Sequence, residues 1–336
     1  MKQYFTLILL TLAFFSCVEN AKRNQSFIKG RDALQMKEFE KAEIQLKLAL
    51  EEDSLFTEAW NNLGIAYDGQ GKTYEALNAY NIALKQDNCL EDAYQNKANV
   101  YYKLKDLDKA INTVSKGLTC NPENTSLLLN RATLLEEKGD FQAALADLKQ
   151  LKQISGISDV LYTNLGFVFY HIGILDSAFH YSLMAIEINH KRHEAFNNLG
   201  MVEMQKKNYG EASKFFEKAI EIIPTNSVYR INLGRSYLND KNFKESVDAF
   251  NMAVYYNEEL ASKETSVYSS LILNKKYQEA TKLLTENIPE GRQAQKLEEI
   301  ITQMISLEEK SSICEYISYL KSKNMEIDKE IYLKCK

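Results

Sequence analysis

The 336-residue sequence contains only 3 prolines and 13 glycines, so it has few residues that break helices. It also lacks a run of basic residues. Its 41 Lys and Arg are outnumbered by 46 Asp and Glu, which gives a net charge of −5. Affinity for a phosphate backbone depends on clustered Lys and Arg, so we expect no nucleic-acid partner. With 45% hydrophobic and 26% charged residues, the composition excludes disordered and collagen-like classes. These features favour a long array of helices.

Motifs for catalysis and cofactor binding are missing as well. The sequence has no glycine-rich nucleotide loop and no nucleophile elbow. His190 and His193 lie close together without further ligand residues beside them, and His171 and His180 fall on different predicted helices. Carboxylates are scattered along polar helix faces, as on a solvated surface. We therefore expect no enzyme activity, no cofactor and no metal site.

The sequence has a single long apolar run, from Tyr4 to Phe15, which is too short to span roughly 30 Å of hydrocarbon as a helix. It ends at Ser16-Cys17, where the chain turns polar at once. Phe14 to Cys17 resembles the lipobox of bacterial lipoproteins, although Phe14 stands where leucine is usual. In that family the cysteine is acylated and becomes the new N-terminus. The alternative is a plain secretory signal, with Cys17 incidental.

From this resemblance we expect a lipoprotein signal peptide at residues 1–16 and a lipidated tether at 17–22. Lipid on Cys17, such as palmitate, would anchor the chain to a membrane surface without spanning it. The expected location is exported and lipid-anchored, at the periplasmic or surface face of the outer membrane.

A 34-residue period runs through most of the chain. One column of small residues recurs without insertion or deletion at Ala42, Ala76, Ala110, Ala144, Ala178, Ala212, Ser246 and Ala280. A second column holds Gly30, Gly64, Ala98, Ala132, Gly166, Gly200 and Gly234. Small residues at these positions let two helices approach closely, and each unit therefore predicts two amphipathic helices joined by a tight turn.

One unit combines Trp60, Leu63, Gly64 and Tyr67 with a later Ala76, and this pattern resembles the tetratricopeptide repeat. The resemblance implies an all-α fold, a right-handed superhelical solenoid of about eight helical hairpins. The eight units are 23–56, 57–90, 91–124, 125–158, 159–192, 193–226, 227–260 and 261–294. After residue 294 the period is lost, and the apolar spacing within 295–336 predicts C-terminal capping helices.

Three charged residues stand at positions where most other units carry an apolar residue: Lys97, Arg131 and Glu203. We expect their charged ends to reach solvent or to pair with neighbours.

Apart from Cys17, the sequence has four cysteines, an even number that permits disulfides in an exported chain. A Cys89–Cys120 pair would centre on the turn of the third hairpin. A Cys314–Cys335 pair would centre on a plausible turn near Asn324. The alternative is that all four are buried or free thiols.

In the tetratricopeptide family the first helix of each unit lines the concave surface. The sixth position of that helix is asparagine in units two to seven: Asn62, Asn96, Asn130, Asn164, Asn198 and Asn232. A carboxamide can both donate to and accept from a peptide backbone, so the row is a candidate site for extended peptides. The alternative is that asparagine simply suits the repeat.

Charged residues flank this row, and acidic ones predominate. The acidic members are Glu58, Asp68, Asp92, Glu136, Glu137 and Glu194, and the basic members are Arg31, Lys103 and Arg235. We therefore expect a neutral to mildly basic ligand.

The resulting hypothesis is a membrane-anchored adaptor or scaffold of the bacterial cell envelope that binds envelope proteins or extended peptide segments. One alternative is a structural subunit of an outer-membrane complex. Another is a ligand-binding or glycan-binding lipoprotein, for which Tyr102, Phe167 and Tyr170 are candidate aromatic contacts. The sequence leaves the oligomeric state open.

Overall fold

The computed structural model describes residues 22–323 and 325. The predicted signal peptide, the predicted lipidation site Cys17 and the cysteine Cys335 lie outside the described residues. The described part is helical and contains no strand, which confirms the all-α prediction. The chain divides into two compact units after Gly156, and each is described by itself.

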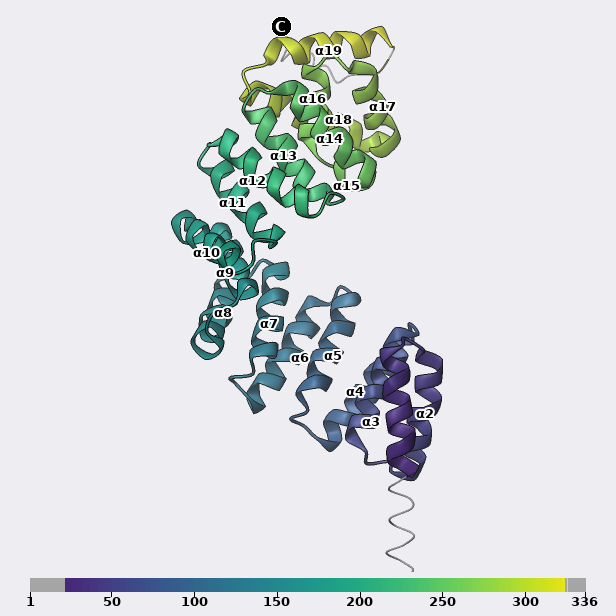
Figure 1. Cartoon of the computed structure of the whole chain (residues 1–336). Coiled ribbons are helices and arrows are strands. Elements are labelled where there is room, and N and C mark those ends of the chain that lie inside the picture. Colours follow the sequence, from purple (N-terminus) through teal and green to yellow (C-terminus); the bar gives the residue numbers. More distant parts are fainter. Residues whose placement is uncertain (1–21, 324, 326–336) are drawn as a thin grey trace, which may run out of the picture. The chain divides into compact units, whose positions relative to one another are not determined.

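The first unit consists of four helical hairpins (Figure 1). The first hairpin pairs a helix that is described over 22–35 with α2. The helices that follow it are α2 (Phe39–Glu52), α3 (Thr57–Gly69), α4 (Thr73–Gln86), α5 (Glu91–Lys103), α6 (Leu107–Cys120), α7 (Thr125–Lys138) and α8 (Phe141–Ser155). Each helix packs mainly against its neighbours in the sequence.

The second unit holds five hairpins and one additional short helix, α15. Its helices are α9 (Asp159–His171), α10 (Leu175–Ile188), α11 (His193–Gln205), α12 (Tyr209–Ile222), α13 (Ser227–Asn239), α14 (Phe243–Tyr256), α15 (Glu258–Ser262), α16 (Thr265–Leu273), α17 (Tyr277–Asn287), α18 (Glu290–Ser306) and α19 (Lys310–Ser322). The contacts again join helices that are close in sequence.

A single left-handed residue turns the chain between the two helices of each hairpin. These residues recur every 34 positions at Lys37, Gly71, Lys105, Gly139, Gly173, Lys207, Lys241 and Lys275, and once more after 33 positions at Glu308. In the fourth hairpin the N–H of Gly139 donates to Glu136 O (3.0 Å) and that of Asp140 to Leu135 O (2.9 Å). Such paired bonds satisfy the last carbonyls of a helix.

The last of these turns shows that α18 and α19 form a ninth hairpin of nearly the same length as the others. The amino-acid pattern fades after residue 294, but the backbone geometry continues. Apolar side chains of the two helices are buried in one cluster with those of α16: Val267, Leu271, Ile300, Ile301, Met304, Ile313, Ile317 and Leu320. The C-terminal hairpin thus covers the apolar side of the hairpin before it.

Glycines in the first helices make room for aromatic rings of the second helices. A Cβ on Gly64 would lie 2.5 Å from Tyr80 Cε1, and one on Gly234 would lie 2.8 Å from Phe250 Cε1. Both rings are almost completely buried. The small residues of the first helices and the aromatic rings of the second helices are therefore in close contact with each other.

The charged residues that interrupt the apolar columns find polar partners. Arg131 makes two bonds of 2.7 Å to the carboxylate of Asp147, which is buried. Lys97 Nζ donates to Asn81 Oδ1 (2.7 Å), and its partial burial lowers the pKa of its amine. The buried Glu203 accepts from Asn208 Nδ2 (2.7 Å). Pairing within or beside the hairpin, rather than simple exposure, accommodates these charges.

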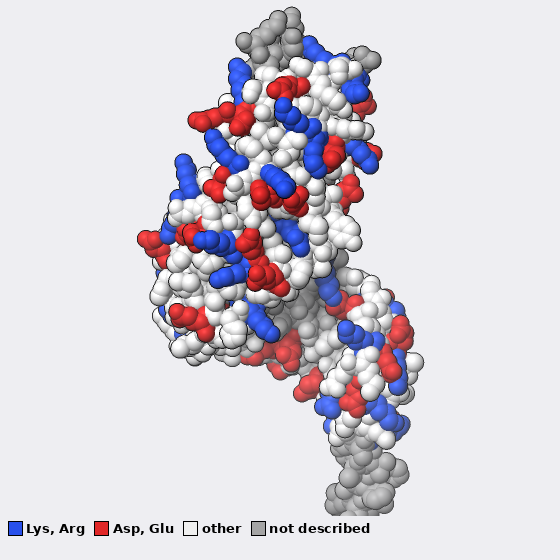
Figure 2. Space-filling model, turned by 45° about the horizontal axis from the view of Figure 1, so that its top comes forward, with Lys and Arg blue, Asp and Glu red and all other residues white. Residues whose placement is uncertain are grey.

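Acidic and basic side chains are interspersed over the face drawn in Figure 2. Among the described residues, no helix combines the length and the apolar character needed to cross a membrane.

Candidate groove sites

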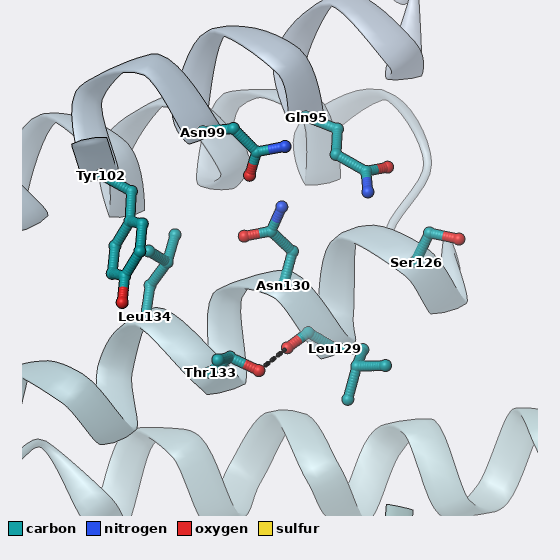
Figure 3. A pocket seen from close by; sticks show the side chains of 8 residues that line it. All are labelled: Gln95, Asn99, Tyr102, Ser126, Leu129, Asn130, Thr133 and Leu134. Carbon is teal, nitrogen blue, oxygen red and sulfur yellow. Dashed lines mark hydrogen bonds between the residues drawn. The ribbon is translucent and has the colours of Figure 1, made fainter. Parts of the chain in front are cut away.

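The first helices of the third and fourth hairpins border an open cavity of about 410 Å³ in the first unit (Figure 3). Helix α5 contributes Gln95, Asn99 and Tyr102. Helix α7 contributes the remaining lining residues, Ser126, Leu129, Asn130, Thr133 and Leu134. No side chain in this lining carries a charge. The 34-residue repeat explains the arrangement, because it gives both helices the same place in successive hairpins.

Three carboxamides line this cavity beside the apolar groups of Tyr102, Leu129 and Leu134. The side chains of Gln95, Asn99 and Asn130 point toward one another in Figure 3. None of them has a hydrogen bond to another residue that the structure describes. Thr133, in contrast, uses its hydroxyl to donate to Leu129 O (3.0 Å). Each carboxamide offers one acceptor and two donors, so the cavity can bind a polar, uncharged group.

The asparagine row does not behave as a uniform ladder. Asn96 Nδ2 donates to Asn61 Oδ1 (3.2 Å). Asn198, 4% exposed, donates to Thr163 O (3.0 Å). Asn232 donates to Asn197 Oδ1 (2.9 Å). In each of these three bonds the acceptor belongs to the first helix of the preceding hairpin. These carboxamides join successive hairpins.

The other three members are half-buried and have no hydrogen bond to a described residue: Asn62, Asn130 and Asn164. Of these, Asn130 lines the first cavity, whereas Asn62 and Asn164 line neither of the two groove cavities described in this section. Sequence reasoning missed Gln95 and Asn99. They lie one residue before and three residues after Asn96, where helical spacing places them on the same side of α5.

A second, smaller cavity of about 200 Å³ lies within the second unit. Its lining comes from the first helices of three hairpins and from one buried ring of α12: Tyr170, Met201, Met204, Gln205, Phe216, Asn232 and Arg235. Two of its polar side chains, Asn232 and Arg235, have partners. Arg235 Nη2 forms an ion pair with Glu264, and its Nη1 lies 3.5 Å from Asn232 Oδ1.

Most of the charges expected to flank the row are also paired. Lys103 Nζ lies 2.7 Å from Asp68 Oδ2, and Glu194 Oε2 lies 3.6 Å from Arg192 Nη1. One oxygen of Glu136 and the Oε2 of Glu194 are buried without a hydrogen bond, and burial raises the pKa of the Glu136 carboxyl to about 8. The groove thus presents less acidity than the sequence suggests.

A disulfide joins Cys89 to Cys120, with their Cα atoms 5.6 Å apart. Cys89 lies two residues before α5, and Cys120 ends α6, just before the short loop that leads into α7. The bond therefore ties together the starting points of the two helices that line the first cavity. The expected Cys314–Cys335 pair involves Cys335, outside the described residues.

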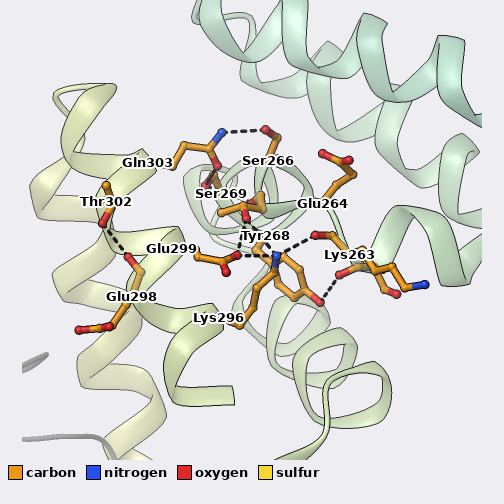
Figure 4. Close-up of polar contacts among 12 residues, drawn as sticks. Lys263, Glu264, Ser266, Tyr268, Ser269, Lys296, Glu298, Glu299, Thr302 and Gln303 are labelled. Carbon is orange, nitrogen blue, oxygen red and sulfur yellow. Dashed lines mark hydrogen bonds and ion pairs between the residues drawn. The ribbon is translucent and has the colours of Figure 1, made fainter. Parts of the chain in front are cut away.

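A closed polar network lies between α16 and α18 (Figure 4). The buried Lys296 donates to Lys263 O (2.7 Å), to Thr265 Oγ1 (3.0 Å) and to Glu299 Oε2 (2.9 Å). Gln303 completes the contact by donating to Ser266 Oγ (2.7 Å). All three protons of the Lys296 ammonium are used, so this network holds the last hairpin in place and leaves that ammonium no donor for a ligand.

In the described part of the chain, no group of three or more His, Cys, Asp or Glu residues could hold a metal ion. His193 Nδ1 lies 2.7 Å from the hydroxyl of Tyr229, and burial lowers the pKa of His171. The absence of enzyme activity and of a cofactor stays a prediction.

The comparisons with known proteins agree with this architecture. A family profile described as tetratricopeptide repeat matches residues 29–89, 62–125 and 96–156, and a second such profile matches 193–226. The chain is a tetratricopeptide repeat protein. Such repeats are characteristic of protein-interaction scaffolds, and the tetratricopeptide fold is typically not catalytic.

The repeats are similar to those of very different proteins. Protein O-mannosyl-transferase TMTC1 of Homo sapiens is 23% identical over 181 residues, which is 54% of this chain and 17% of that protein. The chain thus spans about a sixth of that curated relative.

Two solved structures share the fold. A tetratricopeptide repeat protein from Parabacteroides merdae has a TM-score of 0.61 and 20% identity, over 75% of this chain and 99% of that one. The Cut9–Hcn1 hetero-tetramer of APC/C has a TM-score of 0.57 and 16% identity, over 75% of this chain and 47% of that one. These likenesses establish the fold and the hairpin arrangement.

Proposed function

We propose that the protein is an adaptor that binds an extended peptide segment of a partner protein in the cavity between α5 and α7. The observation that carries this proposal is the set of three carboxamides, Gln95, Asn99 and Asn130, which converge without protein partners. Gln95 and Asn130 are half-buried and Asn99 is exposed, so their donors and acceptors are available to a ligand.

A peptide backbone fits this lining better than a charged side chain does. Each peptide unit carries one N–H donor and one C=O acceptor, which a single carboxamide can meet together. A buried charge would need an opposite charge beside it, and the lining offers none. The cavity therefore favours recognition of main chain over recognition of charged side chains, and the partner segment should be neutral at this point.

We infer that the adaptor works in the bacterial cell envelope, held to a membrane by lipid on Cys17. The short apolar run and the lipobox-like residues at 14–17 support this inference. The Cys89–Cys120 disulfide also supports it, because such bonds persist mainly in oxidising compartments. The partners would then be envelope proteins, and the outer membrane is the location that the signal favours.

Selection from a display library of random peptides, followed by affinity measurement, tests the proposed peptide binding. The test variant changes Gln95, Asn99 and Asn130 together to Ala. The control changes Asn78 and Asn112 to Ala, two exposed asparagines on the second helices α4 and α6. Selected peptides should bind the control as they bind the wild type and should bind the triple variant at least about tenfold more weakly. Equal binding to the triple variant would overturn the proposal.

A glycan is the second candidate ligand, because the same uncharged lining includes the ring of Tyr102, on which a sugar can stack. Envelope oligosaccharides in place of peptides distinguish the two. Binding of an oligosaccharide that is lost both in Tyr102→Ala and in the triple variant, with no peptide selected, would favour this reading.

Anchoring is tested separately by intact-mass analysis of the protein from cells. The wild type should begin at Cys17 and carry acyl chains, and Cys17→Ser should be released or left unprocessed. A soluble wild type that is cleaved at another bond would contradict the anchoring.

A further inference from the structure

We propose that the cavity in the second unit binds one apolar side chain, of the Met, Leu or Phe type, from a peptide of a partner protein. This inference rests on the proposed adaptor function, and it assigns a different chemistry to a different part of the protein. The two cavities differ in what they leave unsatisfied, and a ligand has to supply what is missing.

The lining of the second cavity has an apolar part, formed by two methionines and two aromatic rings, beside a polar part that includes Gln205, Asn232 and Arg235. Met201 and Met204 of α11 are half-buried, and the ring of Phe216 beneath them is 1% exposed. Tyr170 of α9 adds a further ring. Thioethers are flexible and polarizable, so two methionines beside aromatic rings adapt to apolar groups of different shape.

Two polar side chains of this lining, Asn232 and Arg235, already have partners. Asn232 donates to Asn197 Oδ1 (2.9 Å) and accepts from Arg235. Arg235 is neutralised by Glu264. Asn197 in turn donates to the sulfur of Met201 (3.4 Å). A polar or charged ligand that bound Asn232 or Arg235 would compete with these contacts, whereas an apolar group beside the methionines leaves them intact. In the first cavity the carboxamides lack such partners, and the preference is reversed.

The size of the cavity limits the occupant. Its volume of about 200 Å³ is half that of the first cavity, about 410 Å³. Sites for small molecules usually span about 300 to 1,000 Å³. One side chain therefore fills this space, and Gln205, which is exposed at the lining, is available to the backbone that carries the side chain.

Methionine methyl groups offer a direct readout of the occupant. The full-length protein in detergent micelles, with 13C-methyl methionine, is titrated with the N-acetyl amides of methionine, leucine and phenylalanine. The N-acetyl amides of glutamine and glycine serve as comparison probes. The signals of Met201 and Met204 are assigned from Met201→Leu and Met204→Leu. These signals should shift and saturate with the apolar probes, and should stay in place with the other two.

Met204→Gln should weaken binding of the apolar probes at least about tenfold, while Met204→Leu, which keeps the site apolar, should retain it. Met252→Gln is the matched control, since Met252 is 39% exposed on α14 and outside the cavity. Equal shifts with the glutamine and phenylalanine probes, no shift at all, or unchanged binding in Met204→Gln would overturn the proposal.

The two cavities can be judged independently. The triple variant of Gln95, Asn99 and Asn130 should leave the methionine shifts unchanged. If selected peptides depend on those three residues and the methionine signals do not respond, the apolar site is refuted while the adaptor proposal stands. If the methionine signals respond but no selected peptide depends on the three carboxamides, the main-chain site is refuted instead.

Discussion

The ring of Phe216 occupies the space that a side chain at residue 200 would need. A Cβ on Gly200 would lie 2.5 Å from Phe216 Cε1, closer than real atoms approach. Gly200→Ala should therefore lower the free energy of unfolding by about 1 to 3 kcal/mol. Gly210→Ala is the control, since an added Cβ there meets nothing within 4 Å. Urea denaturation measures both.

A double variant separates the steric contact from other effects. Combining Gly200→Ala with Phe216→Leu should cost less than the sum of the two single changes, because the smaller side chain relieves the clash. Additive losses would show that the ring and the glycine do not constrain each other.

Asn198 and Asn130 occupy equivalent positions in their repeats, but their replacement should have different effects. Asn198 is buried and bonded to Thr163 O, so Asn198→Ala should cost about 1 to 3 kcal/mol of stability. Asn130 has no such bond among the described residues, and Asn130→Ala should leave the melting temperature nearly unchanged. Thermal unfolding of both variants decides the matter, and equal losses would contradict the division of the row.

Glu136 should make stability depend on pH. Burial raises the pKa of its carboxyl from an ordinary 4.5 to about 8, so the folded chain holds the proton more tightly than the unfolded chain does. The stabilisation is complete below about pH 4.5 and is lost as the pH rises through 8.

Urea midpoints measured at pH 6 and pH 8.5 test this expectation. Between these values the wild type should lose more stability than Glu136→Gln, which cannot ionise. Glu137→Gln is a suitable control, because Glu137 is exposed on the same helix. Parallel profiles for the wild type and Glu136→Gln would refute the role of Glu136.

The Cys89–Cys120 disulfide should contribute to the stability of the first unit. A cross-link that closes a loop of about 30 residues stabilises by about 3 to 4 kcal/mol on the chain-entropy account. Changing both cysteines to Ser should therefore lower the free energy of unfolding by about 3 to 4 kcal/mol.

The same change should weaken the binding of the selected peptides to the first cavity, because the disulfide holds the starting points of α5 and α7 together. Reduction of the wild type with dithiothreitol should reproduce both effects. Unaltered stability after reduction would show that the bond is dispensable.

The sequence predicted the hairpins well because helix pairing depends on small residues that recur at a fixed spacing. It failed to extend the period to α18 and α19. There the turn comes one residue early, at Glu308, and other apolar residues replace the small and large columns. Backbone geometry is less demanding than the side-chain pattern, so it persists where the pattern does not.

The asparagine row shows a second limit. Six identical residues at identical spacing have different surroundings. Whether each one forms a hydrogen bond depends on which group of the preceding hairpin lies opposite it. Asn61 and Asn197 offer side-chain acceptors to Asn96 and Asn232. A pattern at a single position of the repeat carries no information about that partner. It also does not reveal that Gln95 and Asn99 line the same cavity as Asn130.

The neighbour-only packing of the helices bears on how the chain is made. Within each unit, a hairpin packs mainly against the hairpins next to it in the sequence. A ribosome-bound chain can therefore begin to fold long before its last residues are synthesised, since few contacts wait for distant segments. In a chain that is exported unfolded, the same property works at the far side of the membrane. Each hairpin can fold as it emerges, and the disulfide between Cys89 and Cys120 can close as soon as the third hairpin has formed.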